Sequence, residues 1–315
     1  MKWSCIHANP GQEGSPLIEI NGGNDICAVK FAANGEYIVG GGRDEVRVWR
    51  VEDGKQMATM ASRDVRSLVV SKDGRWIAAG GMGEVIMWDA NTFEKVFSHG
   101  EGCVVYGVDF SPDSTRLVTA SGKSIATVWD VATRKKVHIL DHEHWAIAAK
   151  YSPQGDRIAT ATEKSVRVWD SNNGRILVVV PVKVTAGCNK GLLWSNNHLF
   201  VVSDCTIKEL GPSTSSTVSE WPVHNAGYLS CIALPKHGEF IAYSTKDTVT
   251  FWNTSTHTQL GLIQHTQPIG SIALSPDDRS LAIGGKGGKI TVRSLCPITV
   301  SIIGASRQRS AHLSK

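Results

Sequence analysis

The sequence predicts an all-β fold in which seven similar sheets, each of four antiparallel strands, follow one another along the chain. Three observations support this prediction. The tetrapeptide Val-Arg-Val-Trp at residues 46–49 occurs again at 166–169, and related apolar tetrapeptides recur between and beyond the two copies. A turn rich in Gly, Asn, Asp, Ser and Pro precedes each tetrapeptide. Short apolar runs of strand length flank every turn.

The spacing of the tetrapeptides sets the period of the repeat. Their fourth residues lie 39 to 42 positions apart, at Trp49, Trp88, Trp129, Trp169, Leu210, Trp252 and Arg293. A period in this range indicates an array of stacked units, and it overrides the expectation that 315 residues form two ordinary domains. We therefore expect one domain.

Each repeat contains four strands in a fixed order, which the second repeat illustrates. An apolar run at 66–71 leads into the turn at 71–76, a second run follows at 76–81, the tetrapeptide stands at 85–88, and a last run occupies 94–97. The equivalent turns of the seven repeats lie at 32–37, 71–76, 111–116, 152–157, 195–200, 235–240 and 275–280. No segment shows the periodicity of a helix.

A single four-stranded sheet with two apolar faces cannot bury both of them, and its edges also need cover. Seven such sheets packed face to face around a ring meet both needs. The sequence therefore predicts a seven-bladed β-propeller of four-stranded antiparallel blades.

Three tetrapeptides continue into an Asp, at Trp88-Asp89, Trp129-Asp130 and Trp169-Asp170. With these dipeptides in a common register, the chain resembles the WD-repeat family over about residues 16–295. The resemblance implies a hydrogen-bond network in each blade that joins a His, an Asp, a Ser and the Trp. His265 matches the His of this network, Asp44 and Asp247 are candidates for its Asp, and Leu210 and Arg293 replace its Trp in repeats five and seven.

The predicted propeller occupies residues 1–303, and two segments could complete its last blade. The apolar segment 16–20 precedes the first repeat, as an added outer strand would, and 297–303 could fill the same place. We favour the N-terminal segment. Residues 304–315 are short and polar, so we expect them to form a mobile tail.

Composition narrows the class of partner. The 33 Lys and Arg against 29 Asp and Glu give a net charge of +4, too small a bias to predict binding to nucleic acid or to an anionic membrane. No signal-peptide or membrane-spanning segment is present in the sequence, which favours an intracellular protein, cytoplasmic or nuclear. Seven cysteines without a Cys-x-x-Cys pair predict buried free thiols and no disulfide framework.

Motifs that would carry chemistry are weak. The glycine-rich segment 284–291 lacks the first Gly and the final Ser or Thr of a phosphate-binding loop, and no helix follows it. His142 and His144 would point to one side of a strand, but nothing else in the sequence is committed to completing a metal site, so we expect them to be solvated loop residues. We predict no cofactor, no metal and no enzymatic activity. The alternative is a propeller enzyme with a metal or hydrolytic site at the mouth of the channel.

The seven first strands align in one column of small residues: Ala28, Ser67, Gly107, Ala148, Gly191, Cys231 and Ser271. This column is expected near the central channel, where strands crowd. The position directly before this column and the position three residues before it are chemically mixed and therefore available to contact a partner. The candidates for such contacts are Asp64, Arg66, Tyr106, Trp145, Lys190 and Tyr228.

These candidates predict a non-catalytic scaffold or adaptor that binds an extended protein segment carrying acidic residues on one rim. We expect a monomeric propeller within a larger assembly. By contrast, the Trp of each tetrapeptide and Trp194 occupy apolar strand positions, so we assign them to the core.

Overall fold

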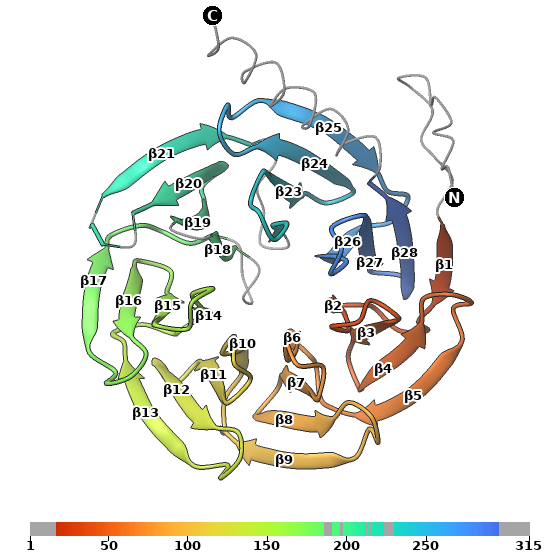
Figure 1. Ribbon diagram of the computed structural model, residues 1–315, viewed down its shortest axis with the longest axis horizontal. Helices are drawn as coiled ribbons and strands as arrows, with labels where there is room; N and C mark the ends of the chain where they lie inside the picture. Colours follow the sequence, from red (N-terminus) through yellow and green to blue (C-terminus); the bar gives the residue numbers. More distant parts are fainter. Residues whose placement is uncertain are drawn as a thin grey trace, which may run out of the picture.

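The computed structural model describes residues 17–185, 191–195, 198–211, 213–214, 216–223 and 230–295. In this part of the chain, 28 strands form seven sheets of four antiparallel strands, arranged as blades around a common axis (Figure 1). The described residues contain no helix. The predicted seven-bladed β-propeller is confirmed.

Each blade runs from its first strand near the axis to its fourth strand at the perimeter (Figure 1). Blade 1 contains β2 (Ala28–Phe31), β3 (Tyr37–Gly41), β4 (Glu45–Arg50) and β5 (Gln56–Ala61). Blade 2 contains β6 (Ser67–Val70), β7 (Trp76–Gly80), β8 (Glu84–Asp89) and β9 (Lys95–Gly100). Blade 3 contains β10 (Val105–Phe110), β11 (Arg116–Ser121), β12 (Ile125–Asp130) and β13 (Lys136–Asp141). Blade 4 contains β14 (Ala148–Tyr151), β15 (Arg157–Ala161), β16 (Val166–Asp170) and β17 (Ile176–Val180).

The remaining blades follow the same order. Blade 5 contains β18 (Leu192–Ser195), β19 (His198–Ser203), β20 (Thr206–Leu210) and β21 (Thr217–Pro222). Blade 6 contains β22 (Cys231–Ala233), β23 (Phe240–Ser244), β24 (Thr248–Asn253) and β25 (Gln259–Gln264). Blade 7 contains β26 (Ile269–Leu274), β27 (Ser280–Gly285), β28 (Lys289–Ser294) and, as its fourth strand, β1 (Ile18–Asn21).

The polar turn between the first and second strands is held by its own side chains. Ser71 donates a hydrogen bond to Asp73 over 2.6 Å, and its hydroxyl oxygen accepts one from the main-chain N–H of Trp76 over 2.9 Å. Ser111 and Asp113 repeat the arrangement in blade 3, where the Ser111 hydroxyl holds the pKa of the Asp113 carboxyl below its usual range. These local bonds explain why the turn recurs with Ser and Asp at the same spacing.

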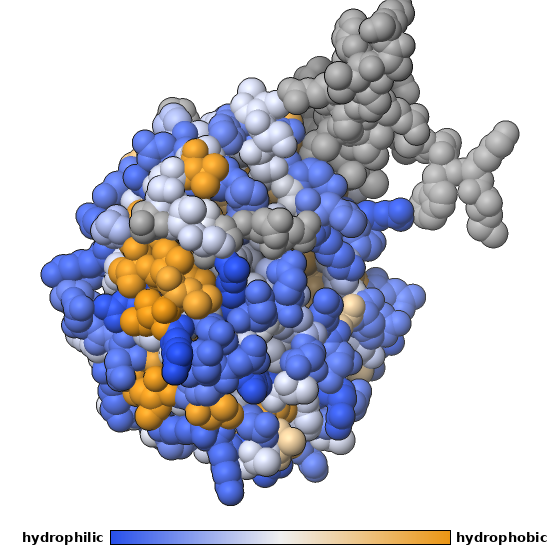
Figure 2. All heavy atoms as spheres, turned by 60° about the vertical axis from the view of Figure 1, so that its left-hand side comes forward, coloured by the Kyte–Doolittle hydropathy of each residue, from blue (hydrophilic) through white to orange (hydrophobic). Residues whose placement is uncertain are grey.

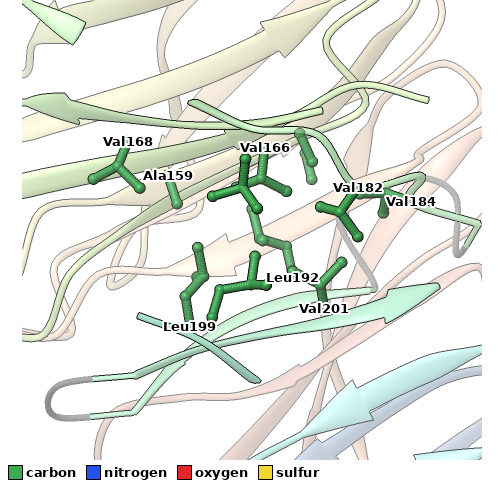
Figure 3. Close-up of a cluster of buried hydrophobic side chains, with 12 residues drawn as sticks. Ala159, Val166, Val168, Val182, Val184, Leu192, Leu199 and Val201 are labelled. Carbon is green, nitrogen blue, oxygen red and sulfur yellow. The ribbon is translucent and has the colours of Figure 1, made fainter. Parts of the chain in front are cut away.

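Apolar side chains fill every interface between neighbouring blades. Between blades 4 and 5, for example, Val166, Val168 and Val182 pack against Leu192 and Leu199 (Figure 3). Each of the other six interfaces has a cluster of the same kind. Both faces of each sheet are therefore buried against a neighbour.

The Trp residues of the tetrapeptides belong to these clusters, as predicted. Trp49, Trp88, Trp129, Trp169 and Trp252 are all buried. Two of them also donate a hydrogen bond from Nε1 to a threonine of the adjacent second strand: Trp129 to Thr119 over 3.1 Å, and Trp169 to Thr160 over 2.7 Å. Leu210 takes the place of Trp in blade 5 and is equally buried.

The family network is only partly formed. His265 lies with Nδ1 2.9 Å from the carbonyl oxygen of Gln267 and Nε2 3.3 Å from the hydroxyl of Thr291. Asp247 meets His265 through the main chain, because its carbonyl oxygen accepts the His265 N–H over 2.7 Å. Likewise, the Asp44 carbonyl oxygen accepts the N–H of Ser62 over 3.2 Å. Main-chain bonds thus replace the side-chain role that the resemblance implied for both residues.

Blade 7 combines strands that are distant in sequence. β1 pairs antiparallel with β28, placing Ile18 opposite Val292 and Ile20 opposite Ile290. Lys289 adds an ion pair to Glu19 over 2.9 Å. Ile20 is buried with Trp49 between blades 7 and 1. The other segment considered for this place, 297–303, and the predicted tail at 304–315 lie outside the described residues.

Two assignments to the core need correction. Trp194 packs on the cluster between blades 4 and 5 but is only partly buried, and its Nε1 donates to the carbonyl oxygen of Lys150 over 3.2 Å. The four cysteines in the described residues are free thiols, but only Cys231 among them is buried. Cys27 and Cys103 are half-buried, and Cys205 is exposed because it lies in the tight turn before β20. Cys5, Cys188 and Cys296 lie outside the described part.

The burial of Trp129 gives a stability prediction. Trp129→Ala removes an indole that is 3% exposed and packs edge-on against Phe97 at 5.4 Å between ring centroids, and it leaves the Thr119 hydroxyl without this partner. We expect the free energy of unfolding, measured by urea titration, to fall by about 3–5 kcal/mol. Trp145→Ala, which truncates a Trp that is 61% exposed, is the control and should change it by less than about 0.5 kcal/mol. Equal losses in the two variants would contradict the packing role of Trp129.

Candidate functional site

The loops between the fourth strand of one blade and the first strand of the next lie at one end of the ring, together with the loops between second and third strands. We call this end the upper face. Asp64 and Arg66 lie in the β5–β6 loop, Tyr106 lies near the start of β10, and Trp145 lies in the β13–β14 loop. Lys190 and Tyr228, the other two candidates, lie outside the described residues.

The β5–β6 loop is fixed by main-chain bonds to the loops beside it. Val65 donates to the carbonyl oxygen of Gly42 over 2.9 Å, and Arg66 donates to that of Gly80 over 2.8 Å. Asp64 has a φ of 46°, a left-handed conformation that Asp tolerates better than most residues. Its carboxylate accepts a hydrogen bond from the Arg66 guanidinium. Arg66 is therefore held in place on a rigid loop.

Tyr106 and Trp145 form an aromatic pair across blades 3 and 4. Their ring centroids lie 6.4 Å apart and their planes differ by 21°. Trp145 is the one exposed Trp among the described residues, at 61% of its surface. The indole thus presents a broad apolar face to solvent at a defined position.

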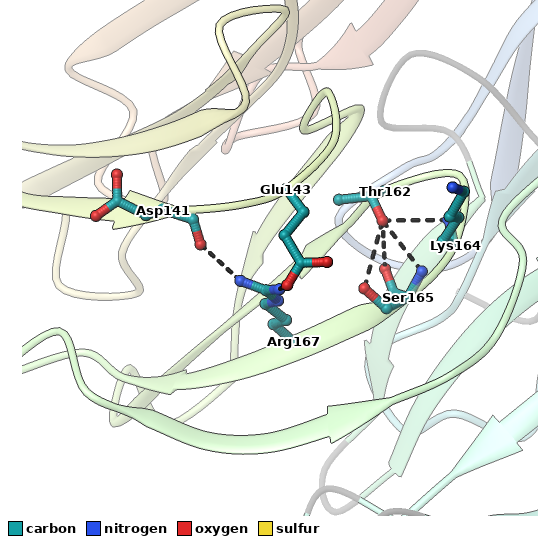
Figure 4. A network of polar contacts seen from close by, with 6 residues as sticks. All are labelled: Asp141, Glu143, Thr162, Lys164, Ser165 and Arg167. Carbon is teal, nitrogen blue, oxygen red and sulfur yellow. Dashed lines mark hydrogen bonds and ion pairs between the residues drawn. The ribbon is translucent and has the colours of Figure 1, made fainter.

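A pocket of about 260 Å³ adjoins this indole. It is lined by Ser124, Glu143, His144, Trp145, Ile147 and Glu163. Glu143 forms an ion pair with Arg167 over 3.1 Å, and Arg167 also donates to the carbonyl oxygen of Asp141 over 2.8 Å (Figure 4). Thr162 accepts hydrogen bonds from the N–H groups of Lys164 and Ser165, which shapes the loop that carries Glu163 (Figure 4). Two carboxylates beside an exposed indole suit a cationic side chain.

The sequence did not reveal this acidic pocket. Glu143 and Glu163 come from different loops, β13–β14 and β15–β16, and neither belongs to a motif. The only available signal was the alternation of His and acidic residues before Trp145, which does not indicate which side chains turn toward the indole.

The prediction that His142 and His144 are both solvated is wrong for His142. Its ring packs edge-on against the buried Trp169 at 5.4 Å between centroids, whereas His144 lines the Trp145 pocket. Burial, with the nearby Arg167 charge, lowers the pKa of His142 to about 4. The loop backbone turns the two side chains into different surroundings. Within the described residues, no group of three or more His, Cys, Asp or Glu side chains is placed to hold a metal ion.

Near the axis, the first strands contribute a second polar cluster. Lys30 of β2, Lys150 of β14 and Arg66 line a cavity of about 40 Å³. Asp109 of β10 pairs with Lys150 over 3.3 Å and accepts the N–H of Tyr151 over 3.0 Å. Arg66 thus lies between the axial cavity and the rim of the upper face.

The perimeter carries a separate apolar surface. Figure 2 shows apolar side chains gathered in patches on this side of the ring. Exposed aliphatic residues occur on three neighbouring fourth strands: Val137 and Ile139 on β13, Ile176, Leu177 and Val179 on β17, and Val218 on β21. Every residue of β17 is aliphatic.

Comparison with protein families adds to this geometry. A family model described as "WD domain, G-beta repeat" matches residues 54–89, 91–130, 134–170 and 255–293. Each matched segment ends at the third strand of a blade, in blades 2, 3, 4 and 7. The chain is a WD-repeat β-propeller. In this propeller, blade 7 matches the family although Arg293 replaces its Trp, whereas blade 5, with Leu210, does not match.

A comparison with curated proteins gives no match. WD-repeat propellers typically bind proteins or peptides, commonly serve as interaction scaffolds and are generally non-catalytic. The described residues of this propeller contain no helix that could span a lipid bilayer.

The half-buried His142 predicts a pH dependence of stability. Its folded-state pKa of about 4 lies below its ordinary value of 6.5, so between these values the unfolded chain binds the proton more readily. The contribution of neutral His142 to the free energy of unfolding is therefore lost as the pH falls from 6.5 toward 4. His142→Phe keeps a ring against Trp169 and removes the titration. Between pH 7 and pH 5, its free energy of unfolding should fall by about 1–2 kcal/mol less than that of the wild type, as measured by urea titration. Parallel losses in both proteins would refute this assignment.

Proposed function

We propose that this WD-repeat propeller is a non-catalytic scaffold or adaptor that binds an extended segment of a partner protein across the part of the upper face that carries Arg66, Tyr106 and Trp145. The observation that carries the proposal is the exposure of Trp145, at 61%, beside a pocket on otherwise rigid loops. The coarser role, protein binding, is typical of the family.

The aromatic pair supports a binding role because its exposure is unusual within this chain. The Trp residues at repeated positions are buried between blades, whereas Trp145 lies at a position where no other repeat has a Trp. Covering an exposed indole removes a large apolar surface from water, and Trp is enriched among residues that dominate interface energies. Tyr106 stacks against it and restricts its orientation.

The charges around the pair define the chemistry of the segment. Glu143 and Glu163 border the indole, so a lysine or arginine side chain of the segment suits the Trp145 pocket. Arg66 lies on the axial side of the same face and suits an acidic residue. The segment expected from the sequence carries acidic residues, and one that also carries a basic residue fits this surface better.

Fixed loops favour this role because a preformed surface loses little conformational entropy on binding. The β5–β6 loop, for example, is packed closely against the loop between β7 and β8. A side chain at Gly81 would collide with the carbonyl oxygen of Arg63, and Met82 donates its N–H to that same oxygen over 2.9 Å. The partner segment would therefore supply most of the adaptation.

Single substitutions test the proposed surface. Trp145→Ala and Arg66→Ala should each weaken the partner complex by about 2 kcal/mol, roughly thirtyfold in Kd, while leaving the melting temperature nearly unchanged. Partners are first captured from the native cell extract and compared by quantitative mass spectrometry, and the affinity of a purified partner is then measured by calorimetry.

Two matched variants serve as controls. Leu262→Ala truncates an apolar residue that is 56% exposed on the outer strand β25, and Arg75→Ala removes an exposed arginine from the turn after β6, at the opposite end of the ring. Both should retain every partner. If Trp145→Ala and Arg66→Ala also retain all partners at wild-type affinity, the proposed surface is not the binding face.

A further inference from the structure

The first strands bring three cationic side chains to the axis of the ring. Lys30 extends from blade 1, Lys150 from blade 4, and Arg66 from the entry to blade 2. All three line the axial cavity of about 40 Å³, together with Ser67, Cys231 and Ser271. The three residues are distant in sequence, and only the ring brings them together.

Carboxylates balance two of the three charges. Lys150 has Asp109 at 3.3 Å, and Arg66 has Asp64. The ammonium group of Lys30 has no hydrogen-bond or ion-pair partner within the described residues, and Lys30 is only partly exposed. Asp109, which pairs with Lys150, also acts on Lys30 through its charge. Among the described residues, the two carboxylates Asp64 and Asp109 therefore face three cationic groups, and a partly buried positive charge in excess of its counter-ions is costly.

We propose that the axial cavity binds a small oxyanion, a carboxylate or a phosphate group, with Lys30 as its counter-ion and Arg66 and Lys150 beside it. The volume of about 40 Å³ limits the bound group to a few heavy atoms. Such a group could be a free anion or the end of an acidic side chain of a bound protein segment. The second case rests on the proposed function, since Arg66 borders both the cavity and the upper face.

The protonation of Lys30 fits this role. Burial, followed by the charge of Lys150, lowers the pKa of Lys30 to about 8, while Asp109 and Cys231 act in the opposite direction. The ammonium form still prevails at neutral pH. An anion in the cavity would stabilise that form and raise the pKa. Above pH 8, where free Lys30 loses its proton, anion affinity should therefore decline.

Calorimetry with sodium phosphate and sodium acetate, against sodium chloride at equal ionic strength, tests the proposal on the purified full-length chain. We expect phosphate or acetate to bind at pH 7 and to bind more weakly at pH 9.5. Lys30→Met should reduce the affinity by about thirtyfold or more, while Lys30→Arg should retain part of it. Lys72→Met, in an exposed turn of blade 2, is the control and should bind as the wild type does.

NMR of the lysine side chains provides a second measurement that does not depend on affinity. The Lys30 resonance should titrate near pH 8 in chloride and at higher pH in phosphate. In chloride, Lys30→Met should melt at the same temperature as the wild type or higher, because it removes an unbalanced charge. Equal anion affinity in wild type and Lys30→Met, or a Lys30 titration that phosphate does not move, would overturn the proposal.

Two further comparisons are needed. The first distinguishes a free anion from an acidic group of the partner, and the second distinguishes the anion site from the proposed partner-binding face. A partner segment that displaces phosphate would identify its own acidic group as the ligand, and one that binds together with phosphate would identify a free anion. Trp145→Ala should lose the partner and keep phosphate binding. If the wild-type chain binds phosphate but Trp145→Ala retains its partner, the result supports the anion site and refutes the proposed binding face.

Discussion

Seven strands must meet around one axis, and the crowding there governs the rest of the molecule. The positions of closest approach hold small, buried residues, among them Ala28, Ser67, Ala148 and Ser271. Serine hydroxyls at these positions also tie blades together: Ser271 accepts the N–H of Val29 over 3.1 Å, and Ser67 accepts that of Val108 over the same distance. Hydrogen bonds from these side chains therefore fix the position of each first strand relative to the first strand of the next blade. The apolar interfaces between blades lie outside this inner ring of strands.

The same crowding separates positions that serve packing from positions that can carry chemistry. A residue that must fit between two blades is constrained alike in most repeats, as the buried Trp129 and Trp169 illustrate, although Leu210 and Arg293 take this place in blades 5 and 7. Other residues, in the loops that lead into the first strands or on the axial side of those strands, face the upper rim or the axis, where each blade can differ. Arg66, Trp145 and Lys30 all occupy such places. The repeated fold thus supplies a rigid frame, while its unrepeated residues distinguish this propeller from others.

The fold was predictable because one signal occurs seven times. The spacing of the tetrapeptides fixes the number of blades, and the burial of Trp at the repeated position follows from it. Contacts between loops of different blades were not predictable. The pocket formed by Glu143, Glu163 and Trp145, and the approach of Lys30 to Lys150, depend on the closed ring and leave no local pattern. His142 was misjudged for a related reason: its burial against Trp169 depends on the path of one loop.

The pairing of β1 with β28 has a consequence for synthesis of the chain on the ribosome. Glu19 and Lys289, which form an ion pair in blade 7, are 270 residues apart, so at ordinary elongation rates β1 waits roughly 15–50 s for its partner to be made. During that time the face of blade 1 that contains Val29, Ile38 and Trp49 lacks its cover from blade 7. A chain interrupted shortly before β28 would therefore present uncovered apolar surface at both ends of an open arc, making the nascent propeller a substrate for chaperones until its last blade is complete.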